Sequence, residues 1–126
     1  MEQTSATSNS GPGYARAPEH TVDVTPYGGT VSVTFEGRII AESSNALEMR
    51  EANHGAVLYI PAADVRINLA TKLENSTHCP FKGAATYWRF GDVDDVAWSY
   101  ETPYDEVAEI AGHLAFYPDK VEISTG

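Results

Sequence analysis

The sequence predicts a mainly β domain with one short α-helix. Short runs of β-branched and aromatic residues alternate with polar ones, and turn residues such as Gly, Asp and Pro separate these runs at close intervals. A single segment carries helix signals at both ends. With 126 residues, 42% of them apolar, the chain is long enough for one domain with its own core.

The first 20 residues predict a flexible leader, and residues 21–126 predict a single folded domain. The leader is rich in Ser, Thr, Gly, Pro and Ala and has no hydrophobic period. It has neither the basic start nor the apolar stretch of a secretory signal. No apolar run approaches the roughly 18 residues of a membrane span, so we expect a cytoplasmic protein without membrane contact.

The first strands are predicted from alternation. Residues 22–24 and 30–35 alternate between apolar and polar side chains, and the turn at 36–37 allows a tight hairpin into residues 38–41. Residues 45–51 suit a helix by propensity and a strand by alternation, and the neighbouring strands favour a strand.

The middle of the chain predicts a buried strand followed by a loop. Residues 56–60 form a compact apolar run that ends at Pro61, which is typical of a strand covered on both faces. Residues 66–77 have weak periodicity and predict a loop.

Two further hairpins are predicted in the second half. Residues 84–90 and 96–101 flank a turn rich in Gly and Asp at 91–95. Residues 113–117 and 121–124 flank a Pro-Asp-Lys turn and predict another hairpin.

The short α-helix is predicted to begin after Thr102. Thr102 is a suitable N-cap, Pro103 fits the first helical position, and Asp105 can close a capping box. Gly112 is a helix stop. The apolar stripe of this helix consists of Val107, Ile110 and Ala111.

Charge and cysteine content exclude several classes of protein. The 18 acidic and 8 basic residues give a net charge of −10, which disfavours nucleic-acid binding because phosphate recognition depends on clustered Lys and Arg. Cys79 is the only cysteine, so the chain can form neither an intrachain disulfide nor a zinc site of four thiolates.

The densest group of chemically active residues lies at 77–83. Cys79 is a candidate nucleophile because His78 precedes it and Lys82 follows three residues later, and positive groups stabilise a thiolate. Lys82 is also a candidate anion contact. The alternative interpretation is a turn in which Cys79 is a small packed residue.

The sequence contains two weaker candidate sites. His113 could act as a general base near neutral pH, and with His78 and Cys79 it could ligate a metal, but the spacing fits no familiar metal site and we predict none. Asp92, Asp94 and Asp95 could bind magnesium, although acids in such a turn more often bond backbone amides.

Aromatic residues on the 84–101 hairpin predict an aromatic wall. In one register Trp88 faces Trp98 and Thr86 faces Tyr100. A slip of one residue instead groups Tyr87 with Trp98 and Tyr100. Such rings can hold a flat heterocycle or a cation, or they can form the core.

Four motifs give the sequence a family resemblance. They are Tyr59-x-Pro61-x-x-Asp64-Val65, Thr77-x-Cys79-Pro80-Phe81-Lys82-Gly83-x-Ala85-x-Tyr87, Trp98-x-Tyr100-x-x-Pro103 and Gly112-x-x-Ala115-Phe116-Tyr117. Their order and spacing, from about residue 31 to 123, resemble domain-of-unknown-function family 427.

The resemblance implies a β-tent domain, in which two antiparallel sheets lean together. It favours the register that groups Tyr87, Trp98 and Tyr100. Relatives of this fold hold zinc with paired cysteines, which this chain lacks, and other β-tent domains bind flat ligands in aromatic cages. The family also carries a nucleotidyltransferase label, but the chain has no glycine-rich phosphate loop.

We therefore expect a binding module for a small heterocyclic or anionic metabolite. Its predicted pocket is lined by Thr77, Lys82, Tyr87, Trp98, Tyr100 and Tyr117. One alternative is an enzyme that uses Cys79 or His113 in the same pocket, and another is an adaptor whose acidic face binds a basic protein. The sequence specifies no cofactor and allows a homo-oligomer.

Overall fold

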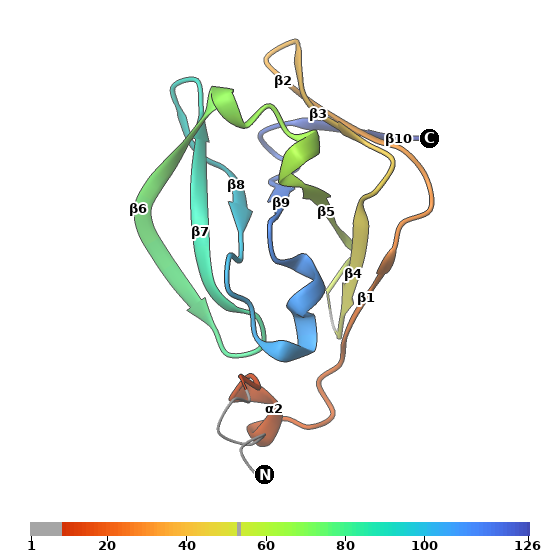
Figure 1. The fold of residues 1–126 in the computed structure, drawn as a ribbon, viewed down its shortest axis with the longest axis vertical. Coiled ribbons are helices and arrows are strands. Elements are labelled where there is room, and N and C mark those ends of the chain that lie inside the picture. Colours follow the sequence, from red (N-terminus) through yellow and green to blue (C-terminus); the bar gives the residue numbers. More distant parts are fainter. Residues whose placement is uncertain (1–8, 53) are drawn as a thin grey trace.

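The computed structural model describes residues 9–52 and 54–126, and it confirms a mainly β fold of two antiparallel sheets (Figure 1). The larger sheet has the strand order β1-β4-β5-β9-β8-β7-β6, and the smaller has the order β10-β2-β3. The strands are β1 (Val22–Pro26), β2 (Val31–Phe35), β3 (Arg38–Ser43), β4 (Leu47–Glu51), β5 (Val57–Pro61), β6 (Ala70–Cys79), β7 (Gly83–Phe90), β8 (Val93–Ser99), β9 (His113–Phe116) and β10 (Glu122–Thr125). The helical turns are α2 (Gly13–Arg16), η1 (Ala62–Asp64), η2 (Ile67–Leu69) and η3 (Asp105–Ile110).

The central strands of the larger sheet are buried on both faces. Because neighbouring residues on a strand point to opposite sides, each face carries its own hydrophobic cluster. Ile60 of β5 joins a cluster with residues of the smaller sheet, which we call the intersheet cluster, whereas Tyr59 joins a cluster on the other face. We call this second group the η3 cluster, since η3 covers it. Its buried members are Met49, Tyr59, Ala85, Tyr100, Val107, Ile110 and Ala115.

Several predicted elements are confirmed. Residues Leu47–Glu51 form a strand, and β2 and β3 form a hairpin whose turn residues Glu36 and Gly37 have φ angles of 50° and 82°. In the β7–β8 hairpin, Tyr87 pairs with Trp98, so the observed register is the one that groups Tyr87, Trp98 and Tyr100 on one face.

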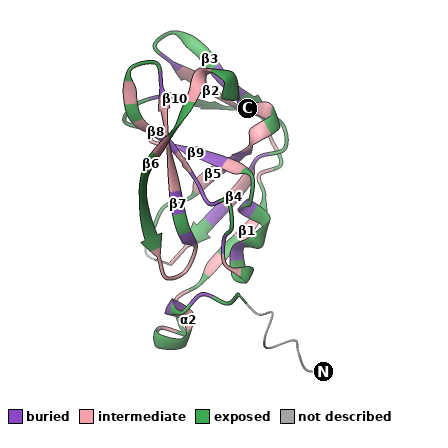
Figure 2. Cartoon of the chain, turned by 60° about the vertical axis from the view of Figure 1, so that its left-hand side comes forward, coloured by how far each residue is buried: buried purple, intermediate pink, exposed green. Residues whose placement is uncertain are grey.

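The loop predicted at 66–77 is wrong over most of its length. Strand β6 begins at Ala70 and pairs with β7 alone, at the edge of the sheet. Its side chains are mostly exposed (Figure 2), so the sequence has no apolar alternation to reveal it.

The predicted third hairpin is also wrong. A turn does form, with Lys120 N donating to Tyr117 O at 3.0 Å, but β9 and β10 lie in different sheets. Three of the four β9 residues are buried, and β9 is a central strand with β5 and β8 on its two sides. The chain therefore crosses to the smaller sheet after this turn, where β10 pairs with β2.

The helix predicted after Thr102 begins later and is a 3-10 helix. Residues 102–104 precede the helix and contact the β6–β7 turn, where Tyr104 N donates to Lys82 O at 3.0 Å. Helix η3 then runs from Asp105 to Ile110 without a side-chain cap. It buries Val107 and Ile110 of the predicted stripe, whereas Ala111 is exposed at its C-cap. Within residues 9–52 and 54–126, the α-helix is α2, a single turn within the predicted leader.

None of the described helices is long and apolar enough to cross a membrane. The flexibility of residues 1–20 stays a prediction. Residues 1–8 lie outside the described part, and residues 9–20 contact the domain as set out below.

Candidate functional site

The β6–β7 turn is held in one conformation by its backbone. Lys82 N donates to Cys79 O at 3.3 Å, which closes the turn. Gly83 follows with a φ of +120°, which only glycine adopts without strain, and a Cβ there would lie 3.4 Å from Thr102 O. The turn therefore fixes the positions from which the side chains of Cys79 and Lys82 extend.

Lys82 forms a half-buried ion pair with Glu51, the last residue of β4. Lys82 Nζ donates to Glu51 Oε1 at 2.6 Å, and His20 Nε2 donates to Glu51 Oε2 at 2.8 Å. The Glu51 side chain is only 9% exposed and that of Lys82 16%. Burial raises the pKa of Glu51, but hydrogen bonds from Lys82 and His20 more than offset this and hold the pKa below its ordinary value. Glu51 is therefore ionised at neutral pH.

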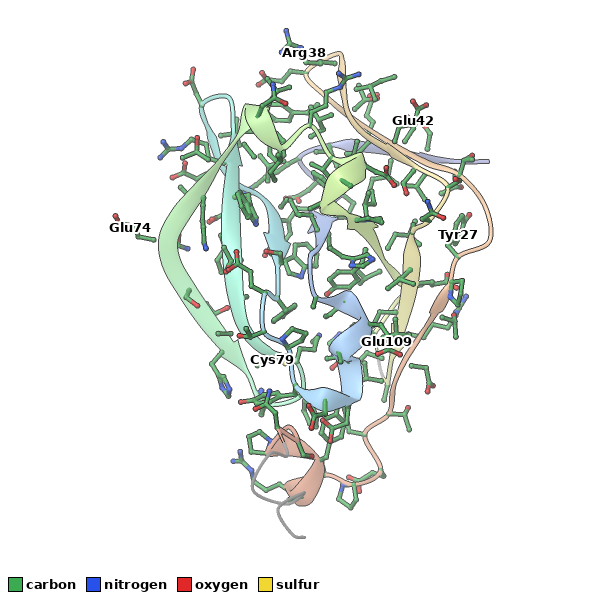
Figure 3. The ribbon with its side chains drawn as sticks, in the orientation of Figure 1. Tyr27, Arg38, Glu42, Glu74, Cys79 and Glu109 are labelled. Atoms are coloured by element: carbon green, nitrogen blue, oxygen red, sulfur yellow. The ribbon has the colours of Figure 1, made fainter. Side chains whose placement is uncertain are left out.

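A pocket of about 270 Å³ opens beside this ion pair. We call it the Glu51 pocket. It brings the carboxylate and ammonium together with the thiol of Cys79, which lies at the lower end of β6, toward η3 (Figure 3). Its lining residues are Met49, Glu51, His54, Gly55, Val57, Cys79 and Lys82.

The predicted aromatic wall lies on the same face of the larger sheet as the Glu51 pocket. Tyr87 and Trp98 pack against the η3 cluster, as does Cys79. Trp98 Nε1 donates to the Tyr59 hydroxyl at 3.2 Å, and the centres of the Trp98 and Tyr117 rings lie 4.5 Å apart. Tyr87 and Trp98 are therefore packed side chains. The η3 cluster connects them to the Glu51 pocket, because Met49 belongs to both.

Buried tyrosine hydroxyls add neutral polar groups to this face. Burial is the main cause that raises the pKa of Tyr59 to about 12, and it also raises the pKa of Tyr117 to about 12, with the Tyr87 hydroxyl contributing. Tyr100 is 7% exposed, and burial together with Tyr59 and Cys79 places its pKa above the ordinary value. All three phenols therefore keep their protons at neutral pH.

The other candidate residues take different positions. Thr77 is exposed on β6 and shares a hydrogen bond of 2.6 Å with the Tyr87 hydroxyl. His78 shares a hydrogen bond with the Tyr104 hydroxyl, on the opposite side of β6 from Cys79. His113 Nδ1 donates to Ala111 O at 2.9 Å, and His113 is not among the residues that line the Glu51 pocket.

The acidic turn of the β7–β8 hairpin is engaged by two cations. Arg89 pairs with Asp94, and Lys120 Nζ donates to the backbone oxygens of Asp94 and Asp95. Within residues 9–52 and 54–126, no group of three or more His, Cys, Asp or Glu side chains is placed to hold a metal ion.

Sequence reasoning missed Glu51, His20, Met49 and Tyr59. A usable signal existed for Glu51, because Leu47 and Met49 alternate on the apolar face of β4 and Glu51 continues that face with a carboxylate. Tyr59 belongs to a family motif, but that motif alone indicates no role for its hydroxyl. His20 carried no signal, since its contact with Glu51 spans 31 positions of sequence.

Comparison with known proteins places the chain in a family. No curated protein matches it. The family model described as "Domain of unknown function (DUF427)" matches residues 23–125, which covers both sheets and every strand except the first residue of β1. The chain therefore belongs to the DUF427 family.

Proposed function

We propose that this domain binds a small heterocyclic molecule in the Glu51 pocket. The observation that supports the proposal is a half-buried Glu51–Lys82 ion pair that opens onto a pocket whose walls include the apolar side chains of Met49 and Val57. Burying two charges costs desolvation energy, so such a pair is weak evidence for a stabilising role. Beside a pocket it supplies one acceptor and one donor of fixed position, as expected of a recognition site.

The size and charge of the pocket favour a neutral ring over a nucleotide. A volume of about 270 Å³ lies just below the range of about 300–1,000 Å³ that is usual for drug-sized ligands. Glu51 repels a phosphate, and so does the net charge of −10. A planar ring with adjacent N–H and carbonyl or ring-nitrogen groups instead matches the carboxylate and ammonium, while Met49 and Val57 contact its apolar faces.

A thermal-shift screen with purine and pyrimidine bases and pyridine carboxamides tests the proposal. A ligand at 100 times its Kd adds about 2.7 kcal/mol, which raises the Tm of a domain of this size by roughly 10 °C. Glu51→Gln and Lys82→Met should abolish the shift, whereas Lys72→Met, which breaks the exposed Lys72–Glu101 pair, should preserve it. A screen without hits, or hits that survive Glu51→Gln, would contradict the proposal.

A covalent role for Cys79 is a second candidate, because its thiol lines the same pocket. The variant Cys79→Ser distinguishes ligand binding from covalent chemistry. Binding without covalent chemistry predicts that Cys79→Ser keeps the thermal shift. Selective and rapid alkylation of Cys79 near neutral pH, together with loss of function in Cys79→Ser, would favour an enzyme.

A further inference from the structure

A segment outside the matched family region lies against the same end of the domain as the Glu51 pocket. Residues 9–20, including α2, precede the matched residues 23–125 and lie beneath the β6–β7 turn (Figure 1). Gly13 N donates to Pro80 O at 2.9 Å, and the Tyr14 hydroxyl donates to Phe81 O at 3.1 Å. The segment therefore attaches to the two residues that follow Cys79.

Two glycines make this close approach possible. A Cβ on Gly13 would lie 2.7 Å from the Phe81 ring, and a Cβ on Gly11 would lie 2.7 Å from Pro80 O. Contacts this short force a displacement, so any larger residue at these positions would push the segment away. We name residues 9–20 the N-terminal strap.

The strap is also anchored to η3. Asn9 N donates to Asp105 Oδ2 at 2.8 Å, and Asp105 N donates to Asn9 O at 3.0 Å. Gly11 N donates to Glu106 Oε1 at 3.0 Å, and the Ser10 hydroxyl bonds the other oxygen of Glu106. Docking on two separate elements fixes the orientation of the strap as well as its position.

His20, at the end of the strap, reaches the site itself. Its ring stacks on Phe81, with ring centres 4.0 Å apart and planes 23° apart. His20 Nε2 donates to Glu51 Oε2, and Lys82 Nζ donates to Glu51 Oε1. Two donors on two oxygens fix the plane of the carboxylate, whereas one donor leaves it free to rotate.

We propose that the N-terminal strap is part of the binding site, with His20 as a positioning residue that orients Glu51, and that the docked strap holds in place the turn residues Pro80 and Phe81 that follow Cys79. The role in ligand recognition rests on the function proposed above. The docking and the orientation of Glu51 do not, because they are properties of the free protein.

The apparent pKa of Glu51 in the free protein, followed by side-chain ¹³C NMR, tests the positioning role. His20→Ala should raise this pKa toward the ordinary value, and His20→Gln, which keeps a donor, should restore part of the difference. An unchanged pKa in His20→Ala would overturn the role of His20. The titratable groups close to Glu51 are Tyr14, His20, His54, Tyr59, Cys79, Lys82 and Tyr100.

The reactivity of Cys79 tests the docking, and the single cysteine makes the measurement specific. Gly13→Val should accelerate the reaction of the native protein with Ellman's reagent by about tenfold or more, since the strap then spends most of its time undocked and the turn beside Cys79 loses the hydrogen bonds at Pro80 and Phe81. Ala15→Val introduces the same side chain at an exposed position of α2 and should leave the rate unchanged. Equal rates for Gly13→Val and Ala15→Val, with both variants folded by circular dichroism, would overturn the docking.

Ligand binding separates this inference from the proposed function. The Glu51 pKa in His20→Ala and the Cys79 rate in Gly13→Val can change as expected while no heterocycle binds. In that case the docking of the strap is supported and the proposed binding function is contradicted. If a heterocycle binds and His20→Ala reduces its affinity no more than Ala15→Val does, His20 has no part in recognition.

Discussion

At the scale of single residues, Glu51 determines the electrostatics of the site. It accepts hydrogen bonds from a lysine of the β6–β7 turn and from a histidine of the N-terminal strap, and it is nearly buried. A carboxylate in this position stabilises the fold only while it is ionised. The stability of the protein should therefore report the charge of this one group.

The pH dependence of stability follows from the lowered pKa of Glu51. A carboxyl whose pKa is lower in the folded state stabilises the protein above its unfolded value, near 4.5, and this contribution is lost as the pH falls through the folded-state pKa. Urea unfolding between pH 6 and pH 3 should therefore show a smaller loss of stability in Glu51→Gln than in the wild type. Parallel curves for the two proteins would contradict this.

The Tyr59 hydroxyl should contribute measurably to stability. It accepts the hydrogen bond of the Trp98 indole inside the η3 cluster. Tyr59→Phe leaves the half-buried N–H without this acceptor, so we expect a loss of about 1–2 kcal/mol in urea unfolding. Tyr27→Phe, outside the η3 cluster, serves as the control, and equal stabilities of the two variants would argue against the hydrogen bond.

At the scale of elements, the β6–β7 turn carries the site. Gly83→Ala should destabilise the protein by roughly 1–3 kcal/mol, because alanine is strained at a φ of +120° and its Cβ would contact Thr102 and Pro103. Gly55→Ala is the matched control, since no atom lies within 4 Å of its Cβ position and its φ is not positive. A Gly83→Ala variant as stable as Gly55→Ala would show that the turn tolerates other conformations.

Elements with an apolar pattern could be predicted from the sequence, and those without one could not. Alternation predicted β2, and the family resemblance favoured the register in which Tyr87 pairs with Trp98. The edge strand β6 was not predicted, because its exposed polar side chains show no apolar alternation. Hydrophobic periodicity reports burial, so it does not detect a strand held mainly by backbone hydrogen bonds.

Some residues of the candidate site could be predicted from the sequence and others could not. Cys79, Lys82 and Tyr87 lie within one motif, so the sequence showed them together. Glu51 and His20 come from segments that only the tertiary fold brings to Lys82, each 31 positions from its partner. Pairing of isolated charges across such separations depends on topology, which composition and spacing do not encode.

At the scale of the whole molecule, the two hydrophobic clusters share the strands of the larger sheet and should unfold together. Trp88 packs against the intersheet cluster and Trp98 against the η3 cluster, on opposite faces. The single-tryptophan variants Trp88→Phe and Trp98→Phe should therefore each show one fluorescence transition, at the midpoint that circular dichroism gives for the same variant. Fluorescence and circular dichroism midpoints that differ within a variant would show that the faces unfold independently.

The most direct test of the proposed binding site is to map the contacts of a ligand on the protein. Amide chemical shifts recorded while a heterocycle from the screen is added should change at Met49, Glu51, Val57, Cys79 and Lys82, which line the Glu51 pocket. A second pocket, of about 300 Å³, lies between the β2–β3 and β7–β8 turns and is lined in part by Phe35, Arg38 and Phe90. Shifts confined to the Glu51 pocket would support the account, whereas shifts confined to the second pocket would contradict it.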